Sequence, residues 1–570
     1  MSWVARTENV RQRRFGWPDV FLLLFVLAIL AALLSVSHGE VAPRPDVLAP
    51  VNLAPSALPG DALRSLARIF IAFGFSLLFA IAYGYAAARS IFLRRLFIPL
   101  LDILQSVPVL GFLAASVTFL VALTRGSVLG FEIAAVFAIF TAQAWNMTFA
   151  VYHSLVMVPR DLDEASDLMR LSPWAKLTHL ELPTAAIPLV LNSMLSFGAS
   201  WFFLYASESF DYAGHTVRLP GIGSYIFAAQ EAGDTRAMLL ALGTMVVLII
   251  VVDQLFWRPA IAWAHKFKLE HSPSPDPSSF VLTVLRRSVL VGAFEEHLAI
   301  PVLTWVDRVM ARRRPGKGTG GSAMRLAWVV FALVLVAASV AIARGAQPLV
   351  ARGVTLLPHA LLLGLATLGR VLASVVLGAA WTVPVGVAIG LSPKATRWGE
   401  PISQIAASFP ANIAFPFALA LFLDMGLSLN IGAIPLMMLG TQWYILFNVM
   451  AGTIAIPADM KEAARVFGLR GVAFWRNLIL PAIFPSLVTG GITAAGGAWN
   501  ASIVAEFVTW AHHTVAAQGL GAMIAEASAT GDGAAILTGV VVMSVLVVAM
   551  NRFVWRPLYA LAESRFHVEA

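Results

Sequence analysis

The chain has no cysteine and few charged residues. Of its 570 residues, 59% are hydrophobic and only 12% are Asp, Glu, Lys or Arg, whereas a soluble domain carries roughly 25% charged residues. The lack of cysteine excludes disulfides, thiolate metal sites and a cysteine nucleophile. The shortage of charge argues against a soluble enzyme or a nucleic-acid-binding domain, and it indicates a polytopic membrane protein.

Apolar runs of about 18 or more residues are long enough to cross a bilayer. None alternates polar and apolar residues as a barrel strand would, so we expect helices. The expected spans, about 12 in all, are 18–37, 63–88, 97–123, 130–157, 184–207 and 237–257 in the first half, and 325–343, 357–391, 403–423, 429–455, 481–505 and 535–554 in the second. A cleaved signal peptide is the alternative for the first run. We expect a retained helix, because the second half has a matching run.

The two halves repeat one another at a fixed offset. Glu164 and Glu462 are 298 positions apart, and many further pairs share that offset. Upstream the offset is 302, which relates Ser106-Val107-Pro108 to Ser408-Phe409-Pro410. With six spans in each half, both halves insert in the same direction. The sequence therefore predicts an all-α polytopic membrane protein with two parallel-oriented six-helix repeats.

Arginine and lysine gather in alternate loops between the spans. The tendency of such loops to stay on the cytoplasmic side predicts a cytoplasmic N-terminus. We expect a first half at 1–258, a cytoplasmic linker at 259–324 and a second half at 325–570. The linker holds a Pro/Ser-rich stretch at 272–279, followed by an amphipathic segment that we expect to lie on the membrane surface.

Two polar segments, 160–183 and 458–481, interrupt the apolar pattern at the same place in each half. Each predicts a short helix, a turn and a second helix that leads into a span. Gly468 can take the left-handed conformation that ends a helix. Because the first segment has Arg170 at that position, we expect the two turns to differ in geometry.

The first helix of each polar segment carries an aspartate and a glutamate at capping-box spacing. The pairs are Asp161 with Glu164 and Asp459 with Glu462. In such a box the Asp accepts from a free backbone N–H and the Glu reaches back to the cap residue. Helix capping is therefore a purely structural explanation for both glutamates, and it does not exclude a further role in binding a partner.

The second segment, EAARVFGLRGVAFWRNLILP, resembles the EAA loop of ABC importer permeases, written EAA-x3-G-x9-I-x-LP. The first segment keeps the pattern with Ser166 in place of the second alanine and Arg170 in place of glycine. In that family the loop forms coupling helices that sit in clefts of the ATPase subunits. The residues this resemblance implies for ATPase coupling are Asp161, Glu164, Ala165, Arg170, Leu182, Pro183, Asp459, Glu462, Ala463, Ala464, Gly468, Leu480 and Pro481.

Further segments, AWNASIVAEFV at 498–508 and GLGAMI at 519–524, are similar to the nitrate/sulfonate/taurine/bicarbonate branch of these permeases. The resemblance implies a type I ABC importer permease fold with both permease halves in one chain of the bacterial cytoplasmic (inner) membrane. It implies import of a small oxyanion or organic anion, with two copies of an ATP-binding cassette ATPase and an extracytoplasmic substrate-binding protein as partners. ATP and magnesium would bind to the ATPase, and we expect no catalytic residue, metal or cofactor in this chain.

Several polar and aromatic residues in or near the spans are candidates for a translocation pathway. Trp201 and Glu208, like Trp499 and Glu506, are seven apart and share a helix face. The candidates are Ser106, Pro108, Trp145, Trp201, Glu208, Ser408, Pro410, Trp443, Trp499, Asn500 and Glu506. The structural alternatives are hydrogen bonding of the glutamates to nearby backbone, proline kinks and packing of the tryptophans.

Two arginines, Arg68 and Arg370, lie near the outer starts of the second spans. We expect them to reach the lipid headgroups, with attraction of an anion as the alternative. Two rival functions remain. A secondary transporter with parallel halves would show ionisable residues in mid-span, and an intramembrane enzyme would need a clustered acid, base or nucleophile. Neither pattern is evident in the sequence.

Overall fold

The computed structural model describes residues 51–267, 280–288 and 320–565, except 107, 125–126, 213–214 and 511–512, together with a few isolated residues between 293 and 309. The predicted first span at 18–37 lies outside the described residues. So does most of the predicted surface segment of the linker, of which α12 (Phe280–Arg287) is described.

The first half consists of helices joined by short turns, with one small hairpin. Its elements are η2 (Pro55–Ala57), α2 (Leu58–Arg89), α3 (Ile91–Ser106), α4 (Val109–Leu123), α5 (Val128–Val156), α6 (Arg160–Leu168), α7 (Pro173–Lys176), η3 (Leu177–Glu181), α8 (Leu182–Glu208), β1 (Ser209–Tyr212), β2 (His215–Arg218), α9 (Ile222–Ala232), α10 (Thr235–Val252), η4 (Asp253–Trp257), α11 (Arg258–Ala264) and η5 (His265–Phe267).

The second half repeats this order from α2 to α11, with an added 3-10 helix in the broken third span. Its elements are α15 (Gly320–Gly390), α16 (Pro393–Ser408), η7 (Ala411–Ala414), α17 (Phe415–Asp424), α18 (Leu429–Ile454), α19 (Ala458–Val466), α20 (Gly471–Phe474), η8 (Trp475–Ile479), α21 (Leu480–Ala505), β3 (Phe507–Trp510), β4 (His513–Ala516), α22 (Leu520–Thr530), α23 (Gly533–Met550), η9 (Asn551–Trp555) and α24 (Arg556–Arg565).

The repeat seen in the sequence is a repeat of structure. The helices α6 and α19 begin and end 298 positions apart, and the same holds for the antiparallel hairpins β1–β2 and β3–β4. Even the π-helical turns recur at that offset, η3 with η8 and η4 with η9. The hairpins were not predicted, because four-residue strands are too short to show a period in an apolar sequence.

Eight helices in the described part of the chain are long and apolar enough to cross a membrane. They are Pro55–Arg89, Val128–Val156, Pro173–Glu208, Thr235–Phe267, Val350–Gly390, Leu429–Ile454, Gly471–Ala505 and Gly533–Ala562. A bent pair, Pro393–Ser408 with Ala411–Phe422, turns by 71° and adds a ninth if it is one span. The all-α polytopic fold with two repeats is confirmed.

The third span of each half is broken, as its proline predicts. In the first half α3 ends at Ser106 and α4 begins after Pro108, so the predicted span at 97–123 is two short helices. In the second half α16 ends at Ser408, and a short 3-10 helix follows Pro410. Proline lacks the N–H that would continue the ladder and disfavours helical backbone in the residue before it.

The predicted loop between the spans 325–343 and 357–391 is absent. Instead α15 runs without interruption for 71 residues. The joining sequence includes AQPLVAR at 346–352, in which alanine, leucine, glutamine and arginine favour a helix although Pro348 opposes it. At 1.5 Å per residue this helix is roughly 106 Å long, more than three times the hydrocarbon thickness of a bilayer. Its part from Val350 to Gly390 has the length and hydropathy of a span.

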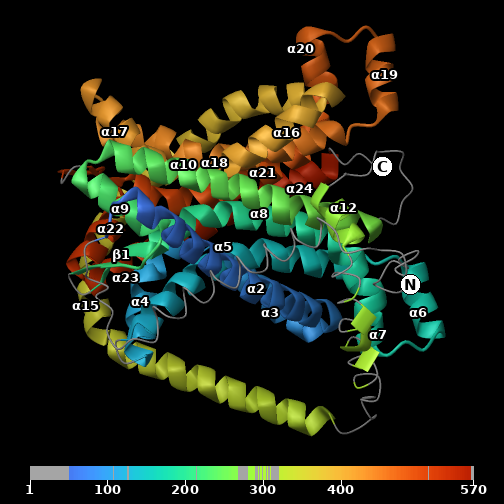
Figure 1. The fold of residues 1–570 in the computed structure, drawn as a ribbon, viewed down its shortest axis with the longest axis horizontal. Helices are drawn as coiled ribbons and strands as arrows, with labels where there is room; N and C mark the ends of the chain where they lie inside the picture. Colours follow the sequence, from blue (N-terminus) through green and yellow to red (C-terminus); the bar gives the residue numbers. More distant parts are fainter. Residues whose placement is uncertain are drawn as a thin grey trace.

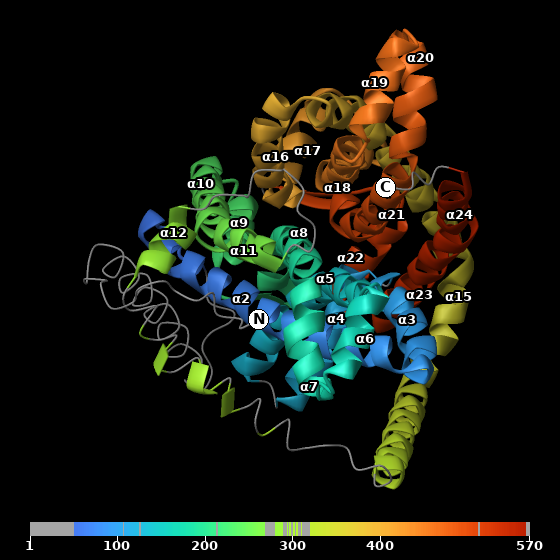
Figure 2. The ribbon, with the colours of Figure 1, turned by 90° about the vertical axis from the view of Figure 1, so that its right-hand side faces the viewer.

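The two halves lie together with their polar segments at one end. Figures 1 and 2 show α6 with α7, and α19 with α20, projecting from the same end of the bundle and lying far apart from one another. The β1–β2 hairpin, α9 and α22 lie at the opposite end in Figure 1. Both polar segments therefore share one side of the membrane, as a parallel duplication requires.

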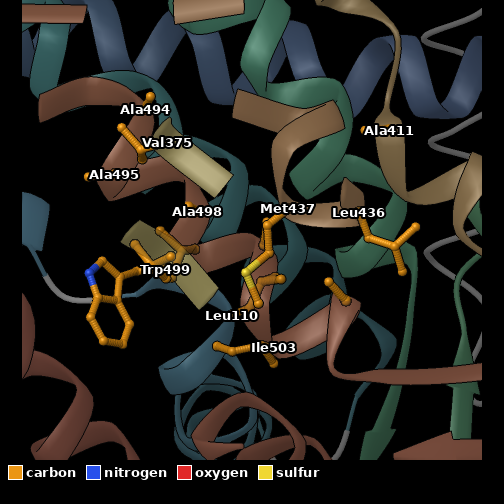
Figure 3. Close-up of a cluster of buried hydrophobic side chains, with 14 of the residues drawn as sticks. Leu110, Val375, Ala411, Leu436, Met437, Ala494, Ala495, Ala498, Trp499 and Ile503 are labelled. Carbon is orange, nitrogen blue, oxygen red and sulfur yellow. The ribbon is translucent and has the colours of Figure 1, made fainter. Parts of the chain in front are cut away.

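Each half packs a piece of its broken third helix against the other half. From the first half, Leu110 of α4 joins a buried cluster whose other members include Met437 and Ile503 of the second half, as Figure 3 shows. In return, Ile413 of η7 is buried in the cluster formed by the first half. This exchange places the two proline breaks at the contact between the halves.

Candidate functional site

The turn of each polar segment closes in the same way. Arg170 has φ 53° and Gly468 has φ 65°, both in the left-handed region. The next residue then donates back to the first helix, Leu171 N to Ser166 O at 3.1 Å and Leu469 N to Ala464 O at 2.9 Å. The two turns therefore close alike, against the prediction, but they differ, as predicted, where the second helix starts. Ser172 caps α7 by accepting from Ala175 N, whereas Gly471, at the position of Pro173, has φ 51° and α20 has no side-chain cap. A left-handed arginine costs about 1 kcal/mol, which the helix-ending hydrogen bonds offset.

The predicted capping boxes are also wrong. The residues before α6 and α19 are Pro159 and Pro457, and neither helix has a side-chain cap. Each aspartate therefore lies inside the first turn, where a negative charge still favours the helix dipole. Glu164 and Glu462 are exposed, and Glu462 lies 3.9 Å from Arg465 on the same helix. Both glutamates are available to a partner.

Apolar side chains at the ends of α6 and α19 lie open to solvent. Leu168 and Met169 are 85% and 74% exposed, and their counterparts Val466 and Phe467 are 78% and 79% exposed. The opposite face of each helix is anchored, since Ser166 and Ala464 are buried. Adjacent exposed apolar side chains on a projecting element mark an interaction surface. The repeat preserves this apolar tip although the residues themselves differ.

The two polar segments also differ in charge. In the first, Lys176 Nζ lies 2.7 Å from Asp163 Oδ1 and 3.0 Å from Asp167 Oδ1, so α7 is tied to α6. The counterparts of the two aspartates at offset 298 are Lys461 and Arg465, and both cations stand on α19. The first segment therefore carries a net charge of −2 (three basic and five acidic side chains), whereas the second carries +2 (four basic and two acidic).

The start of the span that follows each segment also differs. In the first half Glu181 is buried and forms an ion pair with Arg89 of α2. Its counterpart, Ile479, is buried without charge. Pro183 and Pro481 lie in the first turn of α8 and α21, where a missing N–H is harmless. The other predicted coupling residues here are Ala165 and Leu182, which are partly exposed, and Ala463 and Leu480, which are exposed.

At the opposite end of the molecule, Arg68 joins two carboxylates in the first half. Its Nε and Nη2 donate to Glu132 at 2.6 and 2.5 Å, and its Nη1 donates to Glu208 Oε1 at 2.7 Å. Glu208 also accepts from Ser65 Oγ at 2.6 Å and from Gly223 N at 2.7 Å. The prediction that Arg68 reaches the headgroups is wrong, since the residue is 5% exposed.

A matching cluster forms around Arg370 in the second half. Its Nη1 donates to Glu506 Oε1 at 2.7 Å, and its Nη2 donates to Asn430 Oδ1 at 2.9 Å. Thr367 and Gly521 N also donate to Glu506. Arg370 is buried as well, so the headgroup prediction fails here too. A buried charge needs a partner and hydrogen bonds, and the carboxylates supply both.

These clusters explain the paired glycines that follow each hairpin. A Cβ added at Gly221 or Gly519 would lie 2.4 or 2.1 Å from a glutamate oxygen. The backbone must therefore approach Glu208 and Glu506 closely, and only glycine permits it. Both glutamates are thus held in ion pairs at the turn between span and hairpin, and they do not line the larger cavities described below.

A cavity of about 70 Å³ lies where the halves meet. First-half residues of α8 line one wall, among them Phe202 and Phe203, and the second half supplies α16, α18 and α21. Of the predicted pathway residues, the cavity is lined by Ser408, Pro410, Trp443 and Asn500. Its lining contains aromatic rings, two side-chain amides and two hydroxyls, and no charged side chain.

A second cavity of about 200 Å³ adjoins the first and shares Asn500 with it. It is lined by Trp145 of α5 and by polar residues of both halves, including Asn146, Thr493 and Asn551. Asn500 Oδ1 also accepts from Val109 N at 2.7 Å, which satisfies a backbone donor freed by the break at Pro108. The break thus joins the halves beside the cavity.

The remaining predicted pathway residues lie elsewhere. Trp499 is 1% exposed and belongs to the buried cluster between the halves. Trp201 is equally buried, packs edge-on against Phe197 and borders a pocket of only about 10 Å³. Packing explains both tryptophans.

Two residues, Glu132 and Asn430, accept hydrogen bonds through their side chains from the arginines of the two clusters and were missed in the sequence. They occupy the same position of the repeat, since 430 − 132 = 298. A signal was present in the sequence, because Glu132 is a charged residue near the start of an apolar span, and an ionisable residue in a span needs a partner. In the described part of the chain, no group of three or more His, Asp or Glu side chains is arranged to hold a metal ion.

Two parallel sets of membrane helices enclose shared polar cavities, and each set carries a projecting helix pair at the same end. This architecture defines a multi-pass membrane transport protein built by duplication. The model of the family described as "Binding-protein-dependent transport system inner membrane component" matches residues 76–256 and 382–556. The chain belongs to this family and carries its domain twice.

The chain is similar to permeases of named systems. It is 27% identical over 189 residues to the nitrate import permease protein NrtB of Leptolyngbya laminosa. The aligned stretch covers 33% of this chain and 64% of that protein. It is 29% identical over 144 residues to the bicarbonate transport system permease protein CmpB of Synechococcus elongatus, covering 25% and 50%. A probable ABC transporter permease of Brucella melitensis is 29% identical over 224 residues, covering 38% and 86%. The chain thus carries two copies of the permease domain, and it is similar to the nitrate and bicarbonate permeases over less than two thirds of their length.

Proposed function

We propose that the chain is the complete translocation unit of an ATP-driven importer for a small oxyanion or organic anion. The observation that carries this proposal is the pair of helix–turn–helix segments at offset 298. They project from one end of a chain in a permease family and carry exposed apolar tips. The likeness to nitrate and bicarbonate permeases supports the substrate class.

The two projecting segments would each dock in one subunit of a cytoplasmic ATPase dimer. Their apolar tips, Leu168 with Met169 and Val466 with Phe467, provide the buried contact, and Glu164 and Glu462 provide exposed charge beside it. Docking places this end of the molecule, with the N-terminus and the linker, on the cytoplasmic side. ATP and magnesium act in the partner, and a substrate-binding protein would deliver the anion at the hairpin end.

ATP binding would draw the two distant segments together and rock the halves about their contact. The cavities between α5, α8, α18 and α21 lie at that contact. Their uncharged lining suits an anion that must leave as readily as it enters, because a fixed cation would hold it.

Reconstitution with the ATPase tests the proposal. Proteoliposomes that contain the permease, ATPase and binding protein should take up labelled nitrate or bicarbonate only with ATP. A Val466→Asp/Phe467→Asp variant should lose co-purification of the ATPase, whereas Met425→Asp, at an exposed apolar residue before α18, should retain it. Uptake driven by an ion gradient without ATPase would instead favour a secondary transporter.

A further inference from the structure

A polar groove of about 520 Å³ runs along α5 and α8 of the first half. It is lined by Asn146, Phe149, Ala150, His153, Ser154, Met157, Thr184, Pro188 and Asn192. One end reaches Met157 and Thr184, which flank the polar segment 160–183 in the chain. The other end is Asn146, which also lines the second cavity between the halves. The groove therefore leads from the central cavities to the end that carries the projecting segments.

The groove and the cavities are parts of one continuous helix face. On α5, the groove residues Asn146, Phe149, His153 and Met157 are spaced by three, four and four, which keeps them on one side of the helix. On α8 the same spacing carries Thr184, Pro188 and Asn192 of the groove onward to Leu195, Ala199 and Phe203, which line the cavities.

The second half reproduces this polar lining only in part. Tyr444, Asn448 and Ser486 stand at the positions of Asn146, Ala150 and Pro188, but the other polar groups of the groove are absent. At offset 298 the counterparts of His153, Ser154, Thr184 and Asn192 are Ala451, Gly452, Ala482 and Gly490. The two glycines are sites of close helix contact. A Cβ at Gly490 would lie 3.0 Å from Ile445 Cα, and one at Gly452 would lie 2.5 Å from Ser486 Oγ. A side chain at either position would meet the neighbouring helix.

The chemistry of the groove suits a small anion that passes through it. The side-chain amides of Asn146 and Asn192 are neutral hydrogen-bond donors, and Asn192 keeps a second N–H beside the one that it donates to Pro188 O. The hydroxyls of Ser154 and Thr184 add polarity but donate to carbonyls of their own helices. No Asp, Glu, Lys or Arg is among the lining residues. Neutral donors replace part of the hydration shell of an oxyanion without the strong attraction of a buried cation.

We propose that the anion leaves the central cavity along this groove, so that release to the cytoplasm follows the first half and not the second. This inference rests on the proposed function for its direction and its cargo. The duplication then has unequal halves: the first conducts, and the second supplies a closely packed wall and most of the lining of the first cavity.

The absence of cysteine from the whole chain permits a direct test. Single substitutions Asn146→Cys and Asn192→Cys are compared with Asn448→Cys in the second half. Asn448 is a matched control, since Nδ2 of Asn192 and of Asn448 each donates to a carbonyl four residues earlier in its own helix, at 2.9 and 2.8 Å. In the complex with its ATPase, each variant is treated from the cytoplasmic side with an anionic, membrane-impermeant methanethiosulfonate.

Labelling at 146 and 192 should be roughly tenfold faster than at 448, because thiol modification follows exposure. Equal rates at the three positions would overturn the groove. Asn146→Leu and Asn192→Leu should also reduce nitrate uptake several-fold with ATPase co-purification intact, and Asn448→Leu should not. Unchanged uptake in both groove variants would overturn the route. Failure of the unsubstituted chain to import any anion would instead overturn the proposed function, and the labelling rates would still report whether the groove is open.

Discussion

Glu132 and Asn430 occupy the same position of the repeat and contact equivalent arginines, yet one is charged and the other is neutral. Glu132 accepts two hydrogen bonds from Arg68, and Asn430 accepts one from Arg370 through its side chain and one through its backbone. Because Glu208 and Glu506 complete the two clusters, the first holds two carboxylates for one guanidinium and the second holds one.

Glu132→Asn is therefore expected to be tolerated. It would recreate the neutral cluster of the second half, and the free energy of unfolding should stay within about 1 kcal/mol of the unsubstituted value. Glu132→Leu leaves Nε and Nη2 of Arg68 without acceptors and should lower stability by roughly 3 kcal/mol. Thermal unfolding in one detergent compares the two. Equal damage from both variants would show that the second carboxylate itself is required.

Loss of a buried ion pair should be much more harmful than loss of an exposed one. Arg370→Gln leaves Glu506 buried without its charge partner and should destabilise the protein by about 3–5 kcal/mol. Arg352→Gln removes the exposed pair with Asp532 at the same end of the second half, which is worth about 0–1 kcal/mol. Melting temperatures of the two variants, measured in parallel, compare the contributions of the two ion pairs to stability. Similar shifts would contradict the structural role given to Arg370.

Two glycines of the second half should respond to alanine in opposite ways. A Cβ at Gly519 would lie 2.1 Å from Glu506 Oε2, whereas a Cβ at Gly496 of α21 would have no neighbouring atom within 4 Å. Gly519→Ala should therefore disrupt the cluster and lower the melting temperature. Gly496→Ala should raise stability by roughly 0.5–1 kcal/mol, because alanine favours a helix interior. A neutral outcome at Gly519 would show that the hairpin can move away from the glutamate.

The turn at Gly468 should accept arginine better than valine. Arg170 already holds the equivalent left-handed position, so Gly468→Arg should lose only about 1 kcal/mol. Gly468→Val places a β-branched residue at positive φ, where such residues are outliers, and should disturb the apolar tip beside it. Co-purification of the ATPase measures the result. Equal loss of the ATPase in both variants would mean that the glycine is needed for contact and not for backbone shape.

The sequence predicted the features that depend on composition and local period. Apolar run lengths indicate membrane helices whatever their neighbours, and the fixed offset of 298 predicts two halves with the same element order. The proline breaks after Ser106 and Ser408 were also predictable, because proline acts on its own backbone. The motif at Glu462 to Pro481 indicated the family.

The tertiary structure decided which side chains meet. Arg68 and Glu208 are 140 positions apart, and no local period reports their ion pair. The left-handed backbone of Arg170 is imposed by the closing hydrogen bonds of its turn, against the preference of the residue. The polar groove depends likewise on two helices whose faces are brought together by packing. Sequence alone therefore determines the helices and their duplication. The pairing of buried charges and the shape of the cavities follow from packing between residues that are far apart in the chain, and no local sequence pattern reports such contacts.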